Sequence, residues 1–239
     1  FANLTLANAS ASVNGNALRI NGSGTVNIDN VRIIGSSNTA RGPLLFDTQS
    51  SGTLSVSISH SEFTGNSSTT DGGAVAFANA NADGRGMLFI ADSRFSGNST
   101  VTNGGGLLVT TAASSTTDIS IENTTFESNS TGNQGGAIVI SGDNTTLNII
   151  DSTIRGNSAK DGGGVWFQSS AGMFAARNSE FVSNTSSDTG LGGGGALYVH
   201  SAHSVLISDS LFEGNSSSSS GGAMKFETDV RNIVFTDTT

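Results

Sequence analysis

The sequence predicts an all-β protein, a right-handed parallel β-helix (solenoid) of about eight coils of 27–32 residues each. Three observations predict it: a recurring Phe-x-x-Asn phrase, a glycine pair after each copy, and a period-two alternation of apolar and polar residues. If each repeat is one coil, equivalent residues lie above each other in parallel strands. Such coils would rise by about 4.8 Å each, giving a rod about 40 Å long.

The Phe-x-x-Asn phrase gives each coil an apolar residue and a turning residue. We expect its asparagines to form a structural Asn ladder that turns the chain and bonds coil to coil. This ladder comprises Asn66, Asn98, Asn129, Asn157, Asn184 and Asn215. The apolar place is filled by Phe63, Phe95, Phe126, Ile154, Phe181 and Phe212. A degenerate copy with Ile34 and Asn38 precedes the first.

A glycine pair and an apolar strand follow each phrase, and glycine can supply positive φ at a tight corner. The pairs begin at Gly72, Gly104, Gly135, Gly162, Gly194 and Gly221. In the strand after them, one inward column is Val75, Leu107, Ile138, Val165, Leu197 and Met224. A second strand in each coil adds the column Val56, Leu88, Ile119, Leu147, Phe174 and Val205. Stacked in register, these columns form one continuous apolar core.

The whole chain, 1–239, is predicted to be one β-helix domain, with degenerate coils in 1–38 and regular repeats in 39–239. Because the last repeat stops in mid-coil, we expect the domain to belong to a longer chain or an assembly. Loop length varies most in 78–86 and 185–192. Variable loops are where a solenoid usually carries its specificity.

The composition limits the classes of partner that the chain is expected to bind. The formal charge is −9, with ten Lys and Arg residues and no cysteine. An acidic chain without a basic cluster is a poor nucleic-acid binder, and without cysteine it holds no disulfide or thiolate metal site. No apolar run reaches transmembrane length, so we expect no membrane insertion by this segment. No cofactor and no metal site are predicted.

At this point the repeat resembles a known pattern. Phe-x-x-Asn followed by Gly-Gly-Ala and Ile, Leu or Val resembles the polymorphic outer-membrane protein repeats of chlamydial autotransporters, and bacterial β-helix surface proteins more widely. The resemblance covers residues 30–239. It implies a secreted passenger rod, exported to the cell surface and often an adhesin.

Catalytic residues are not predicted. Asp92, Asp151 and Asp209 could suggest a carbohydrate-active enzyme, because such β-helices work with clustered carboxylates. However, they share a repeat column with Asn30, His60, Asn123, Asn178 and Asp237, which suits an Asx corner. A catalytic constellation should break the repeat rather than follow it.

Two histidines fall outside the repeat. His200 and His203 have a spacing that could bind a metal, but without an evident carboxylate or thiolate partner a solvated loop is favoured. The pairs Lys160–Asp161 and Lys225–Glu227 are expected to be ordinary surface pairs.

An apolar stripe is the first candidate binding surface. By alternation, four residues from consecutive coils point outward from the first strand, and two of them are the chain's single Trp and single Tyr. The stripe comprises Leu108, Val139, Trp166 and Tyr198. If exposed, it would suit a partner protein or a sugar ring. The alternative is that a loop covers it or that a widened core includes it.

Many Asn-x-Ser/Thr sequons occur, but most coincide with the ladder. Asn144, in a loop, is the most plausible glycosylation acceptor.

These observations favour a non-enzymatic extracellular structural or adhesive rod, which could stack end to end into a surface fibre because open β-helix ends expose unpaired edges. Its expected partners are copies of itself, a host or surface protein, or a glycan. The alternatives are a carbohydrate-active enzyme or glycan-binding module of the polysaccharide lyase or epimerase kind, and a trimeric receptor-binding rod.

Overall fold

The computed structural model describes residues 1–11, 17–48, 52–81, 83–190 and 192–239. Ala82 and Leu191, in the two loops expected to vary most, lie outside the described residues, as do 12–16 of the degenerate N-terminal coils. Within the described ranges all regular structure is β-strand, and every named strand pairing is parallel.

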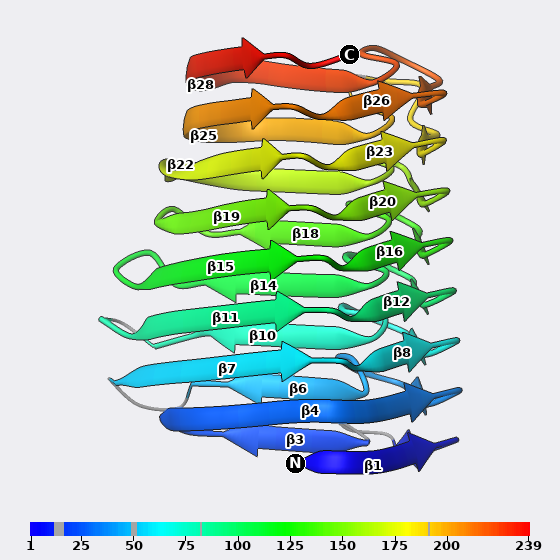
Figure 1. Ribbon diagram of the computed structural model, residues 1–239, viewed down its shortest axis with the longest axis vertical. Coiled ribbons are helices and arrows are strands. Elements are labelled where there is room, and N and C mark those ends of the chain that lie inside the picture. Colours follow the sequence, from blue (N-terminus) through cyan, green and yellow to red (C-terminus); the bar gives the residue numbers. More distant parts are fainter. Residues whose placement is uncertain (12–16, 49–51, 82, 191) are drawn as a thin grey trace.

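The strands form four stacks, and the chain visits each stack once per coil (Figure 1). The first stack, after the glycine corner, holds β3 (Leu18–Asn21), β6 (Leu44–Asp47), β10 (Val75–Asn79), β14 (Leu107–Thr111), β18 (Ile138–Ser141) and the first parts of β22 (Val165–Arg177), β25 (Leu197–Ser208) and β28 (Met224–Thr236). The second stack holds β4 (Gly24–Ile34), β7 (Thr53–Ser59), β11 (Arg85–Ala91), β15 (Thr116–Glu122), β19 (Thr145–Ile150) and the later parts of β22, β25 and β28.

The other two stacks are made of shorter strands. The third holds β1 (Ala2–Ala7), the end of β4, β8 (Glu62–Thr64), β12 (Arg94–Ser96), β16 (Thr125–Glu127), β20 (Thr153–Arg155), β23 (Glu180–Val182) and β26 (Leu211–Glu213). The fourth holds β2 (Ser10–Ala11), β5 (Ser37–Asn38), β9 (Ser67–Ser68), β13 (Ser99–Thr100), β17 (Ser130–Thr131), β21 (Ser158–Ala159), β24 (Thr185–Ser186) and β27 (Ser216–Ser217). This last sheet has eight strands among the described residues, one for each coil.

Figure 1 also shows the hand of the coil. The near strands, such as β11, run left to right, the far strands, such as β10, run right to left, and the chain climbs from the N-terminus at the bottom. Such a path is a right-handed helix. The predicted fold, a parallel β-helix of about eight coils, is confirmed.

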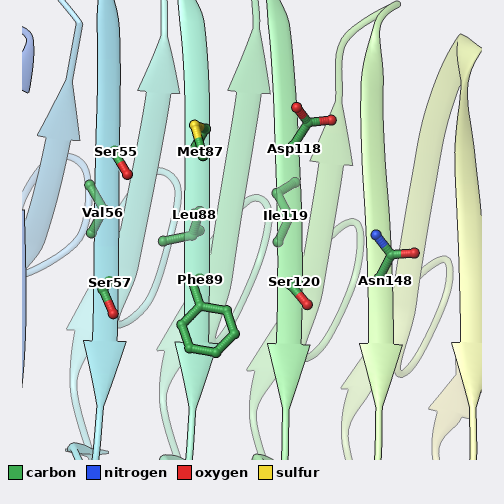
Figure 2. A pocket seen from close by; sticks show the side chains of 10 residues that line it. All are labelled: Ser55, Val56, Ser57, Met87, Leu88, Phe89, Asp118, Ile119, Ser120 and Asn148. Carbon is green, nitrogen blue, oxygen red and sulfur yellow. The ribbon is translucent and has the colours of Figure 1, made fainter. Parts of the chain in front are cut away.

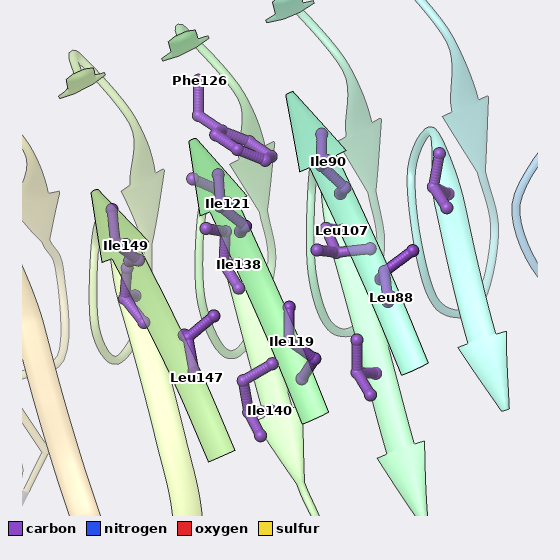
Figure 3. Close-up of a cluster of buried hydrophobic side chains, with 14 of the residues drawn as sticks. Leu88, Ile90, Leu107, Ile119, Ile121, Phe126, Ile138, Ile140, Leu147 and Ile149 are labelled. Carbon is purple, nitrogen blue, oxygen red and sulfur yellow. The ribbon is translucent and has the colours of Figure 1, made fainter. Parts of the chain in front are cut away.

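The core lies inside the coil, where like residues stack on like (Figure 3). Leu107 pairs with Ile138 and Ile119 pairs with Leu147, and the side chains of these residues are at most 1% exposed. The phenylalanine column stacks ring on ring, with centroids 4.6 Å apart for Phe63–Phe95. That spacing is close to the coil rise of about 4.8 Å, so the rings of Phe63, Phe95 and Phe126 contact one another, as those of Phe181 and Phe212 do, with Ile154 between the two groups.

The corners explain the polar columns. All eight residues of the predicted Asx column adopt positive φ, between 45° and 50°. Asn and Asp tolerate this left-handed region better than other side chains, which accounts for the column's composition. At the glycine corner, Gly104 has φ of 69°, while a Cβ at Gly105 would lie 2.3 Å from the carbonyl oxygen of Gly136 in the next coil. The first glycine of a pair therefore turns the chain, and the second lets the coils approach.

The expected positions of the degenerate N-terminal copy of the phrase are wrong. Ser36, not Asn38, occupies the ladder position, because its N–H donates to Oδ1 of Asn66 at 3.0 Å and β5 pairs Asn38 with Ser68. In the same coil Ile33 pairs with Phe63, one residue earlier than the expected Ile34. Because Ile33 and Ser36 replace the Phe and Asn of the phrase, this copy is hard to recognise in the sequence.

Candidate functional site

The apolar stripe points away from the core but is not exposed. Leu108, Val139, Trp166 and Tyr198 form an apolar cluster separate from the core, with side chains between 2% and 7% exposed. Of the two alternatives left open for this stripe, the covered one holds. The physical reason is the glycine corner, which folds back over the outer face of the strand that follows it: a Cβ at Gly135 would lie 2.5 Å from Cγ2 of Val139.

Where the column changes from Leu and Val to Trp and Tyr, a groove opens on the side of the rod. Its volume is about 390 Å³, within the range of small-molecule sites. The lining comes from β18, β22, β25 and the corner loops between them: Gln134, Ser141, Asp161, Trp166, Gln168, Gly192, Tyr198 and His200. The same corner residues, Gln134 and Asp161, are joined by a parallel bridge from coil to coil.

His200 stands in this groove because of a β-bulge. Between β22 and β25 the register shifts so that Gln168 pairs with Ser201, which leaves His200 without a partner residue in the ladder. Its exposed ring lies 6.1 Å from that of Trp166, with the planes only 16° apart. His200 and His203 are both exposed, as expected, but they lie in strand β25 and not in a loop. Bulges commonly re-aim a side chain in this way.

Tyr198 is fixed from the next coil. Its hydroxyl donates to Oε1 of Glu227 at 2.7 Å, and the ammonium of Lys225 lies 4.8 Å from the ring centroid and 2.9 Å from the same carboxylate oxygen. Burial, followed by the bond to Glu227, raises the pKa of Tyr198. The phenol therefore stays protonated and serves as a hydrogen-bond donor to Glu227.

Asp161 forms the acidic wall of the groove. Its carboxylate accepts from the N–H of Gly193 at 3.2 Å, yet burial and the neighbouring charge of Asp188 raise its pKa. Asp188 accepts from the N–H of Gly192 at 2.6 Å, which lowers its own pKa, and pairs with Lys160 at 3.7 Å. The expected surface pair Lys160–Asp161 is thus replaced by Lys160–Asp188, and Asp161 faces the groove.

The indole nitrogen of Trp166 lacks a partner. Within the part of the chain that the structure describes, Nε1 of Trp166 is the one buried side-chain nitrogen or oxygen without a hydrogen bond. Leaving such a donor unsatisfied costs about 1–3 kcal/mol. That atom is buried beneath the groove, whose accessible polar lining comprises a partly buried carboxylate and two amides.

The ladder asparagines have a different role in the structure. In a typical rung, Asn98 donates both its backbone N–H and its Nδ2 to Oδ1 of Asn129, at 3.0 and 2.9 Å, and Nδ2 also donates to the carbonyl of Phe63 at 2.9 Å. The same pattern links Asn66, Asn98, Asn129, Asn157, Asn184 and Asn215. All but Asn215 are at most 1% exposed, so the ladder lies within the fold and not on a binding surface.

The remaining predicted residues lie outside the groove. Asn144 follows a turn before β19, is half-buried, and donates its Nδ2 to the carbonyl of Ala113 at 3.0 Å. In the Asx column, Asn123 and Asp92 bond at 2.6 Å, as Asn178 and Asp151 do at 2.5 Å, so these carboxylates cap a corner.

A second hollow lies on the outer face of the second stack (Figure 2). Met87 and Phe89 of β11 project there with 40% and 38% of their surface exposed, flanked by Ser57 of β7 and by Ser120 of β15. Its volume is about 350 Å³. The hollow is therefore an apolar spot on an otherwise serine-rich face.

Two features, a metal site and a membrane-spanning helix, are absent from the described residues. They contain no group of three or more His, Asp or Glu side chains arranged as a metal site. Nor do they contain a helix with the length and hydropathy of a membrane span.

Sequence reasoning missed the groove, and one signal could have found it. The outward column changes from Ala76, Leu108 and Val139 to the large aromatic residues Trp166 and Tyr198, which a tight glycine corner cannot cover completely. The same coils carry the off-repeat His200 and the long loop after Asn184. Three departures from the repeat at one place indicate a site.

Together these features define a class of protein: a parallel β-helix rod built from Phe-x-x-Asn and glycine-pair repeats, with a groove on its side. Residues 60–78 and 123–141 match the profile of the Chlamydia polymorphic membrane protein repeat. The chain therefore carries repeats of this family, and the resemblance seen in the sequence is confirmed. Neither a curated protein nor a solved structure matches the chain.

Proposed function

We propose that this chain is the rod of a passenger displayed at a cell surface, and that it acts by non-enzymatic adhesion through its sides. The observation that carries the proposal is the polymorphic membrane protein repeat at 60–78 and 123–141, folded into an uninterrupted β-helix. A rod of stacked coils holds binding features at fixed heights along its length. The groove beside Trp166 and the hollow at Phe89 are two such features on this rod.

Surface display and adhesion are tested separately. Protease or antibody applied to intact source cells should reach the chain if it is displayed, and detection only after lysis would refute display. Beads coated with the purified chain should attach to host cells in a saturable way, and attachment should be competed by the soluble chain. Beads coated with heat-unfolded chain are the control, because they carry the same composition without the rod.

A carbohydrate-active enzyme is the second candidate, and one observation favours it. Asp161 places a partly buried carboxylate in the groove, and carboxylates are common general acids and bases in carbohydrate-active enzymes. Incubating the chain with neutral and uronate oligosaccharides and following new reducing ends or unsaturated products tests this candidate. Product that disappears in Asp161→Asn would support an enzyme over an adhesin.

End-to-end stacking into a fibre has its own support. At the coil formed by β28, Ile233 and Phe235 continue the inward columns of Val205 and Ile207, yet they are 40% and 49% exposed. A further coil, of the same chain or of a second copy, would cover them, and the stacking proposal takes the second copy. Light scattering of the purified chain should show growth with concentration that Phe235→Lys abolishes; a monomer at every concentration would refute stacking.

A further inference from the structure

The groove over Trp166 and Tyr198 lies where several departures from the repeat coincide. The bulge at His200, the change of the outward column to aromatic residues and the loop carrying Asp188 all meet there. In the coils below, the same column is filled by Val139 and Leu108 and is closed by the glycine corner. Features that depart from a repeat together at one surface are not needed by the core, so they point to a ligand.

The lining offers both donors and acceptors around an aromatic floor. The amides of Gln134 and Gln168 and the hydroxyl of Ser141 can each donate and accept, and Asp161 accepts. Trp166 and Tyr198, both more than nine-tenths buried, form the floor between these polar groups. A ring that carries several hydroxyl groups satisfies such a mixed set, and its C–H face can pack against the exposed imidazole of His200.

The charge around the groove selects against anions. Lys160 pairs with Asp188, and Lys225 pairs with Glu227. The carboxylate of Asp161 is bonded only to a backbone N–H among the contacts described for it, so three carboxylates face two ammonium groups. A phosphate, sulfate or uronate entering here would meet a net negative field.

We propose that this groove binds a neutral sugar unit of a glycan, with Asp161, Gln168 and His200 as contacting residues. The inference rests on the proposed adhesive function and names the class of partner that the rod holds at this height. The volume of about 390 Å³ suits a short saccharide rather than a folded protein surface.

The chain contains its own reporter, because Trp166 is its single tryptophan. The experiment titrates the complete chain with the N-acetylglucosamine trimer, lactose and maltotriose, and with a galacturonate trimer as the anionic probe, while indole fluorescence is followed. A printed array of neutral glycans extends the search. We expect a saturable change with at least one neutral saccharide and none with the uronate.

The variants locate the binding. Asp161→Asn and His200→Ala should weaken it at least tenfold, whereas His203→Ala, an exposed histidine of the same strand outside the groove, should leave it unchanged. Circular dichroism verifies folding, and His200→Ala carries the test if Asp161→Asn does not fold, since the His200 ring is exposed.

Three results would overturn the proposal: no neutral glycan bound on the array at millimolar concentration, uronate bound as tightly as neutral sugars, or His200→Ala without effect. If attachment of coated beads to cells persists under any of these results, the adhesive function stands and the groove is not its sugar site. If the beads never attach, the adhesive function itself fails.

Discussion

Removing one rung of the asparagine ladder should destabilise the rod strongly. In Asn129→Ala, Oδ1 no longer accepts from the backbone N–H and the Nδ2 of Asn98, which lie 3.0 and 2.9 Å away. The carbonyl of Phe95 also loses the donor that lies 3.0 Å from it. Two buried donors without acceptors cost about 1–3 kcal/mol each, so the free energy of unfolding should fall by about 2–6 kcal/mol.

The matched control is Asn144→Ala. That side chain is half-buried and makes one hydrogen bond, to the carbonyl of Ala113, so its loss should cost about 0.5–1.5 kcal/mol. Denaturant unfolding followed by far-ultraviolet circular dichroism measures both variants, with midpoints compared because repeat arrays can depart from two-state behaviour. Equal midpoints for the two variants would show that the ladder is not the principal polar link between coils.

Three further predictions concern an Asx corner, a glycine corner and a pair of salt bridges. The bond to Asp29 raises the pKa of His60, and the charge of Asp92 adds to it, so this stabilisation is fully present below pH 6.5 and is lost as pH rises through the raised value; in an NMR titration Asp29→Asn should lower the raised pKa, with the part due to Asp92 remaining. Gly105→Ala should lower the unfolding midpoint far more than Gly190→Ala, because a Cβ at Gly190 would meet only the Asp188 carboxylate, at an ordinary 3.4 Å, whereas a Cβ at Gly105 would lie 2.3 Å from a backbone oxygen; equal effects would contradict this. Glu127→Gln, which leaves two arginines without their carboxylate, should lower the melting temperature at low salt more than at high salt, measured by calorimetry.

The fold could be predicted because each coil repeats the same physical solution. A column such as Phe63, Phe95 and Phe126 is visible in the sequence since parallel in-register stacking places identical residues in contact. The Asx column is equally visible, because the left-handed corner restricts it to a few residue types. Ser36 was not recognised because serine can fill the ladder place without an amide.

The groove was missed because alternation gives the direction of a side chain but not what lies over it. Leu108 and Trp166 occupy the same outward column, yet how a glycine corner covers them depends on backbone geometry that the pattern does not encode. The bulge that brings His200 over Trp166 is a register shift of one residue within a continuous strand. In the sequence, that shift looks the same as a longer loop.

The direction of the hydrogen bonds has a mechanical consequence. They run from coil to coil, along the rod, while the chain itself runs across it. Pulling the two ends apart therefore loads one coil's bonds at a time, as in peeling, and does not shear all of them together. Each released coil, such as the 31 residues from Asn98 to Asn129, would add up to about 100 Å of extended chain, so a rod anchored at one end and attached at the other would lengthen stepwise under tension.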